Sequence, residues 1–95
     1  MQNISVNDWK WVVLEIYADP GSDVFVAGTF NQWIPSRFDK LRDKRRDGSY
    51  RLLRQVKKGR HELRFLVNGN WRLNPDLPMS GLPTEAAPSN VMNVV

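Results

Sequence analysis

The sequence predicts an all-β protein, an immunoglobulin-like antiparallel β-sandwich of about seven short strands. Turn signals built from Gly, Pro, Asn and Asp recur at short intervals. The segments between these turns are rich in Val, Ile, Leu, Phe, Tyr and Trp, and several alternate between apolar and polar residues, as half-buried strands do. The length of 95 residues is enough for one hydrophobic core, so we expect a single domain over residues 1–95.

The first predicted strand covers residues 11–17, and the turn 19–22 (Asp-Pro-Gly-Ser) ends it. Trp9 and Trp11 flank or begin this strand and are predicted to be packing groups. Alternation along the strand predicts that the core is lined by Val12, Leu14 and Ile16.

A second short strand is predicted over residues 24–27. It ends at Gly28, where the missing side chain favours a bulge or a close approach between backbones. Pro35 prevents a regular strand after it, residues 38–41 are consistent with a short edge strand, and residues 42–48 form a charged connection.

A further strand is predicted over residues 50–56, but Arg54 shares a face with apolar neighbours, so its buried face stays open. In the strand 60–67 the alternation places Leu63 and Phe65 toward the core and Arg64 away from it.

Asn68-Gly69 is a strong signal for a two-residue hairpin, since type I′ turns require positive φ at both central positions. The hairpin places Trp71 on the strand paired with that of Arg64, close enough to share a ligand. Residues 74–88 contain four prolines and predict a long loop, and residues 90–95 predict a last strand.

The residue inventory argues against an enzyme. The chain has one histidine and no cysteine, and its acids are scattered through turns without the pairing that acid/base catalysis requires. His61 is predicted to be a packed or sheet-edge residue. We therefore expect no catalytic residues, no metal site and no cofactor.

The net charge of +4 is unevenly distributed. Residues 37–72 carry 13 of the 14 basic side chains and a net charge of +9. This asymmetry is typical either of a solvated strand face with a charged loop or of a protein with an anionic partner.

The N-terminal residues do not resemble a signal peptide, and no stretch approaches the about 20 apolar residues that span a membrane. These features predict a soluble cytoplasmic protein without a membrane partner. The alternative is a segment cut from a longer secreted chain.

Trp33 and Trp71 each stand where a strand meets a loop. Their neighbours include amide and guanidinium side chains that can hydrogen-bond to sugar hydroxyls, and large aromatic rings suit the C–H faces of pyranose rings. From context alone, each is equally consistent with a surface platform for sugar and with a core residue.

Two further segments carry a family resemblance. Residues 24–33 read Val-Phe-Val-Ala-Gly-Thr-Phe-Asn-Gln-Trp, and residues 58–71 read Lys-Gly-Arg-His-Glu-Leu-Arg-Phe-Leu-Val-Asn-Gly-Asn-Trp, followed by Asn74-Pro75. In order, spacing and turn residues these segments resemble the glycogen-binding module of AMP-activated kinase beta subunits and, more broadly, family 48 carbohydrate-binding modules.

The resemblance implies an early-set immunoglobulin-like sandwich that binds α-1,4-linked glucans such as glycogen, starch chains or cyclodextrins without catalysis. It also implies that Trp33 and Trp71 stack on glucose rings and that Arg64 contacts sugar hydroxyls.

The chain departs from the kinase subunits before the last strand, where they have Leu-Gly-Thr-Val-Asn-Asn and this chain has Glu-Ala-Ala-Pro-Ser-Asn over residues 85–90. The resemblance implies that the first Asn of this stretch contacts sugar. That position falls on Ser89 by strict register, or on Asn90 if the loop slips by one residue. The departure allows weaker binding or preference for another glucan.

The predicted partner is an α-glucan, with a larger enzyme or kinase assembly as a further partner. The main alternative is a structural or protein-interaction module that has lost sugar binding. Nucleic-acid binding through the basic segment is a weaker alternative, and it would depend steeply on salt.

Overall fold

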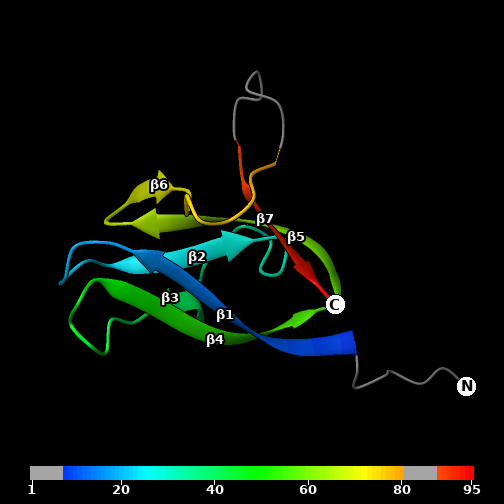
Figure 1. The fold of residues 1–95 in the computed structure, drawn as a ribbon, viewed down its shortest axis with the longest axis horizontal. Helices are drawn as coiled ribbons and strands as arrows, with labels where there is room; N and C mark the ends of the chain where they lie inside the picture. The colour runs from blue at the N-terminus through cyan, green and yellow to red at the C-terminus, as the bar shows by residue number, and fades with distance from the viewer. Residues whose placement is uncertain (1–7, 81–87) are drawn as a thin grey trace, which may run out of the picture.

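The computed structural model describes residues 8–80 and 88–95. One antiparallel sheet pairs β1 (Trp9–Tyr17) with β4 (Ser49–Lys57). The strands of the second sheet are β2 (Val24–Gly28), β3 (Lys40–Leu41), β5 (Gly59–Val67), β6 (Asn70–Arg72) and β7 (Asn90–Val94). The predicted all-β, immunoglobulin-like sandwich is confirmed (Figure 1). No helix in the described ranges is long and apolar enough to cross a bilayer.

Strand β5 is the centre of the second sheet. One of its edges pairs with β2, and β2 in turn pairs with β3. The other edge is shared by two strands in succession, since residues 59–63 pair with β7 and residues 65–67 pair with β6 (Figure 1). Three strands therefore take their register from β5.

The core lies between the two sheets and follows the predicted alternation. Leu14 and Ile16 of β1 are 2% and 1% exposed, and Val12 packs against them. Leu63 and Phe65 of β5 are fully buried on the facing layer. Burying side chains of this size stabilises the fold by about 1.5–3 kcal/mol each.

The buried face of β4, which alternation left open, is the face that carries Arg54. Tyr50 and Val56 on that face are buried in the core. Arg54 is tolerated there because its Nε donates to Oδ1 of Asp39 at 2.9 Å. Its guanidinium also lies over the Phe30 ring, 4.7 Å from the centroid. The ion pair thus links the two layers.

The expected edge strand over residues 38–41 is only partly correct. Residues 37–39 form the 3-10 turn η2 (Arg37–Asp39), and only Lys40 and Leu41 form β3. The cause is a capping box, in which Ser36 Oγ accepts from the Phe38 amide and the Asp39 carboxylate accepts from the Ser36 amide. These local hydrogen bonds compete with extended structure.

The prediction that Trp9 and Trp11 are packing groups is wrong. They are 42% and 64% exposed, on the face of β1 opposite to the core. Val13 and Leu53, which are directly opposite each other across the β1–β4 pair, are similarly exposed. None of the other described strands covers this face, so the alternation that buries Leu14 turns the tryptophans to the outside.

Gly28, at the end of β2, confirms the predicted close approach of backbones. A Cβ atom at this position would lie 2.4 Å from the carbonyl oxygen of Glu62 and 2.7 Å from Cε2 of Phe30. We expect Gly28→Ala to lower the free energy of unfolding by about 3 kcal/mol, the upper end of the usual cost of overpacking, because the backbone of β5 would have to move. Urea unfolding followed by circular dichroism measures the loss.

Gly21→Ala is the matched control. Gly21 also has no side chain, but its Cβ would meet nothing within 4 Å, and only its φ of +85° disfavours alanine. We expect a loss of about 1 kcal/mol from this backbone conformation. Equal losses in the two variants would contradict the steric role of Gly28.

The Asp39 carboxyl predicts a dependence of stability on pH. Burial raises its pKa, but the hydrogen bonds from the Ser36 amide and the Arg54 guanidinium outweigh burial, so the pKa lies below its ordinary value of 3.8. A pKa that is lower in the folded than in the unfolded state means that the carboxylate stabilises the fold above the unfolded pKa. That contribution is lost as the pH falls through the folded value.

We therefore expect Asp39→Asn to be about 2 kcal/mol less stable than wild type near neutral pH, and to lose less stability on acidification below about pH 4. Urea unfolding from pH 7 down to about pH 3 checks both effects. Asp76→Asn, which removes an exposed loop carboxylate, is the control. A wild-type acid dependence that persists in Asp39→Asn but not in Asp76→Asn would contradict the assignment.

Candidate carbohydrate-binding site

Trp71 owes its position to the hairpin between β5 and β6. Asn68 and Gly69 have φ of 50° and 82°, as the predicted type I′ turn requires. The turn sets the register that places Trp71 opposite Leu66, so its diagonal neighbour on β5 is Arg64. Side chains opposite each other in a sheet point to the same side. Trp71 and Arg64 therefore share the outer face of the second sheet, away from the core.

Trp33 reaches the same face from the loop after β2. Asn31 Oδ1 accepts from the Gly28 amide at 2.8 Å, its Nδ2 donates to the Val26 carbonyl at 3.1 Å, and the Trp33 amide donates to the Gly28 carbonyl at 3.0 Å. Gln32 and Trp33 both have positive φ, 52° and 64°. Left-handed conformations of large residues are costly, and such strain clusters at ligand sites.

Arg64 lies between the two tryptophans. Its guanidinium carbon is 4.7 Å from the ring centroid of Trp33 and 5.7 Å from that of Trp71, so both rings make cation–π contacts with it. Its Nε is buried and has no hydrogen-bond partner among residues 8–80 and 88–95. The structure thus brings three of the predicted site residues together in one surface, with Trp71 50% exposed.

The face continues across the sheet from Trp71. Antiparallel pairing places Leu66, Phe25 and Lys40 in one row with it, one residue on each of β5, β2 and β3. Lys40 Nζ lies 5.9 Å from the centroid of the Phe25 ring. Four adjacent strands span about 14 Å. We call this surface, made by Trp33, Arg64, Trp71, Leu66, Phe25 and Lys40, the tryptophan face.

The sequence did not identify Leu66, Phe25 and Lys40 as members of this face. The signal was present, because Phe25 lies between the core residues Val24 and Val26, and alternation alone turns it outward. What the sequence did not supply was the pairing of β2 with β5, which puts Phe25 beside Leu66.

Glu62 also belongs to the outer side of β5, beyond Arg64 from the hairpin. The hydrogen bond from Arg60 to its carboxylate, 2.9 Å long, lowers the pKa of Glu62 below its ordinary value, and the charge of Arg64 contributes in the same direction. Glu62 is therefore an anion at neutral pH and partly balances Arg64.

Ser89 and Asn90 are not brought to the surface. Ser89 is 2% exposed and Asn90 is fully buried. Asn90 Oδ1 accepts from the Asn74 amide at 2.7 Å, and its Nδ2 donates to the carbonyls of Asn74 and Pro78 at 3.0 and 3.4 Å. Since Asn90 is opposite Leu63, it lies on the core side of the sheet. Their sugar contacts stay predictions, and residues 85–87 lie outside the described ranges.

His61 has the structural surroundings expected of a sheet-edge residue. Its Nε2 lies 2.7 Å from the carbonyl oxygen of Lys57 and its Nδ1 lies 2.9 Å from Oγ1 of Thr29. A carbonyl accepts only, so Nε2 carries a proton and donates it to the Lys57 carbonyl. The ring also packs edge-on against Phe30. Both ring nitrogens are engaged in hydrogen bonds that hold this end of the sandwich.

Comparison with known proteins finds relatives of this chain. The chain is similar to FLOURY ENDOSPERM 6, a chloroplastic protein of Oryza sativa subsp. japonica, at 30% identity over 64 residues, which are 67% of this chain and 12% of that protein. It is 28% identical over 64 residues to the chloroplastic PTST homolog 2 of Arabidopsis thaliana, again 67% of this chain and 12% of that protein. It is 30% identical over 59 residues to the 5'-AMP-activated protein kinase subunit beta-1 of Sus scrofa, 62% of this chain and 44% of that subunit.

The matched segment therefore spans less than half of each of these relatives.

A protein family, described as the glycogen recognition site of AMP-activated protein kinase, matches residues 12–95. This range includes Trp33, Trp71, Arg64 and every strand except the start of β1. The chain belongs to this family of glycogen-recognition modules.

Proposed function

We propose that residues 1–95 act as one non-catalytic domain that binds α-1,4-linked glucans such as glycogen, starch chains and cyclodextrins. Trp33 and Trp71 stack on glucose rings, and the terminal nitrogens of Arg64 donate to sugar hydroxyls. The observation that carries the proposal is the position of the Arg64 guanidinium between the two tryptophan rings, at 4.7 and 5.7 Å. This position supports a single site composed of two aromatic surfaces and a hydrogen-bond donor.

The affinity expected from such a site is weak to moderate. Aromatic contacts contribute about 0.5–1.5 kcal/mol each beyond the area they bury, and a few hydrogen bonds add to that. Much of the loop ordering is already present in the free protein, because Asn31 holds the Trp33 loop through two hydrogen bonds. A neutral ligand also releases no counterions, so binding is expected to depend little on salt.

The proposal also includes a partner assembly and a location in the cell. One relative is a kinase subunit by name, which supports association with a larger enzyme or kinase assembly. A cytoplasmic location is proposed for this chain, although two relatives are named as chloroplastic. Fractionation of cells that produce the protein would test the location.

The test of glucan binding is isothermal calorimetry with β-cyclodextrin and maltoheptaose. We expect Trp71→Ala to weaken binding at least about tenfold, since it removes a stacking surface worth more than 1.4 kcal/mol in total with its buried area. Trp11→Ala is the matched control, because Trp11 is 64% exposed but lies on the other sheet. Circular dichroism of both variants checks that the fold is intact.

Equal weakening by the two substitutions, or unchanged binding in Trp71→Ala, would contradict the proposed site. Absence of heat from the wild-type protein would instead favour the module that has kept the fold and lost sugar binding. Binding that falls steeply between low and high salt would favour an anionic partner over a neutral glucan.

A further inference from the structure

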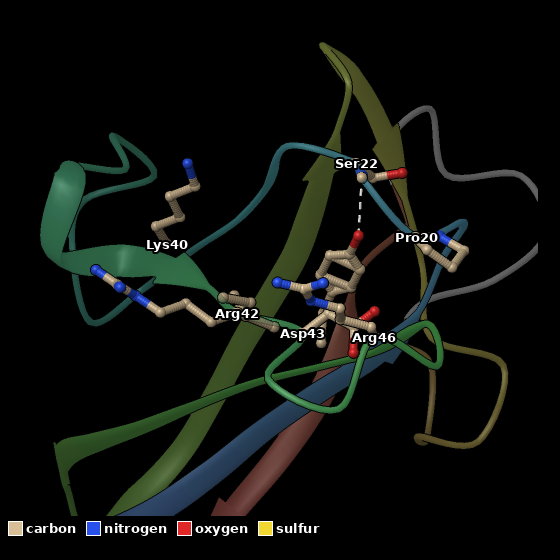
Figure 2. Close-up of a pocket in the computed structure, with 9 residues that line it drawn as sticks. Pro20, Ser22, Lys40, Arg42, Asp43 and Arg46 are labelled. Carbon is tan, nitrogen blue, oxygen red and sulfur yellow. Dashed lines mark hydrogen bonds between the residues drawn. The ribbon is translucent and has the colours of Figure 1, made fainter.

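A basic hollow adjoins the end of the tryptophan face that is farthest from Trp71. Its volume is about 520 Å³, and it lies along the edge strand β3. Four charged residues line it, namely Lys40, Arg42, Asp43 and Arg46. Figure 2 shows the side chain of Arg46 at the hollow, with Pro20 and Ser22 on one side of it and Lys40 and Arg42 on the other. The side chain of Arg42 extends away from Arg46.

The arginines of the hollow form no ion pair with the carboxylate that also lines it. Asp43 uses its carboxylate to accept from the amides of Asp47 and Gly48, at 3.1 and 2.7 Å. In the described part of the chain, neither Arg42 nor Arg46 forms an ion pair. Lys40 pairs with Asp23 at 3.1 Å, but both side chains are largely exposed, so this pair is weak.

Among the polar groups that line the hollow, the guanidinium groups are the main hydrogen-bond donors available to a ligand. The Tyr50 hydroxyl accepts from the Ser22 amide at 2.9 Å and donates to the Asp19 carbonyl at 2.8 Å, so its hydrogen is already used. Guanidinium groups present paired N–H donors that match the oxygen atoms of phosphate and carboxylate groups.

The backbone of Arg46, which lines the hollow, is strained. Its φ is +57°, in the left-handed region that arginine rarely adopts. The turn that imposes it is closed by a hydrogen bond from the Arg46 amide to the Asp43 carbonyl and by the two amide contacts of the Asp43 carboxylate. Strain of this kind is found preferentially at ligand sites.

The hollow and the tryptophan face are continuous through Lys40. Lys40 ends the row that runs from Trp71 through Leu66 and Phe25, and it also lines the hollow. The row spans about 14 Å, since four adjacent strands are separated by three spacings. A chain molecule bound at the tryptophans and following this row would reach the hollow.

We propose that the hollow receives an oxyanion carried by the glucan itself, a phosphate monoester on a glucose unit, so that the domain prefers phosphorylated over neutral α-glucan. The inference rests on the proposed function for the neutral part of the ligand. A phosphate monoester carries about −1.5 to −2 charges near neutral pH, and Arg42 and Arg46, which form no ion pair within the described residues, supply two positive charges at the hollow.

The experiment is calorimetry with maltoheptaose and with the same oligosaccharide carrying a phosphate monoester, at about 0.15 M salt. We expect the phosphorylated form to bind about tenfold more tightly, and Arg42→Gln/Arg46→Gln to bind both forms equally. Lys57→Gln/Lys58→Gln is the matched control, because it also removes two exposed positive charges, both outside the hollow. Arg46→Gly, which also relieves the positive φ, shows the same loss if the double variant fails to fold.

Each other outcome overturns some part of the inference. Equal affinity of the wild type for the two oligosaccharides, or a preference reduced as much by Lys57→Gln/Lys58→Gln as by Arg42→Gln/Arg46→Gln, would overturn it. Inorganic phosphate that competes as strongly as the phosphorylated oligosaccharide would make this a site for free phosphate. A third outcome is that only the phosphorylated oligosaccharide binds, and that this binding is lost in Arg42→Gln/Arg46→Gln but unchanged in Trp71→Ala. This result would refute the glucan site but not the anion site.

Discussion

The pairing of both edges of β5 is the constraint on which the rest of the structure depends. Because β2 covers one edge while β6 and β7 divide the other, the strand cannot slip by one residue without breaking three ladders. Its alternation then has a single outcome. Leu63 and Phe65 are turned into the core, and Arg64 is turned toward the two tryptophans. Core and candidate site are two faces of one strand, so the forces that bury the apolar side also fix the position of the guanidinium.

The two tryptophans of the tryptophan face are held in different ways. Trp71 stands on a regular strand whose position follows from the hairpin at Asn68 and Gly69, two residue types that tolerate positive φ. Trp33 stands on a loop with two successive left-handed residues, and hydrogen bonds from Asn31 and packing around Gly28 compensate for this cost. The end of the same segment is closed by Asp39, which is tied to Arg54 of the other sheet. The loop is therefore held at both ends by groups that belong to the framework of the sandwich.

The features that the sequence predicted correctly are those with local causes. The type I′ hairpin needs only Asn68 and Gly69, and the core face of β1 needs only its own alternation. The features that were missed depend on residues far apart in the chain. Arg54 can face the core only because Asp39 accepts from it, and Asn90 is buried because Asn74 and Pro78 satisfy its amide. Alternation within β1 gives the face on which Trp11 lies, but Trp11 is exposed because no other described strand covers that face, and the sequence of β1 does not show this.

The placement of the four tryptophans has a spectroscopic consequence. Trp9 and Trp11, on the uncovered face of β1, are 42% and 64% exposed, and Trp71 is 50% exposed, so at least three indole rings emit from water-accessible positions. Only Trp33 and Trp71 adjoin Arg64, so a glucan that stacks there would change the fluorescence of two rings against a constant background from the other sheet. Trp9 and Trp11 lie on the other sheet from the tryptophan face. Replacing both by phenylalanine would leave a protein whose tryptophan emission reports on that face alone.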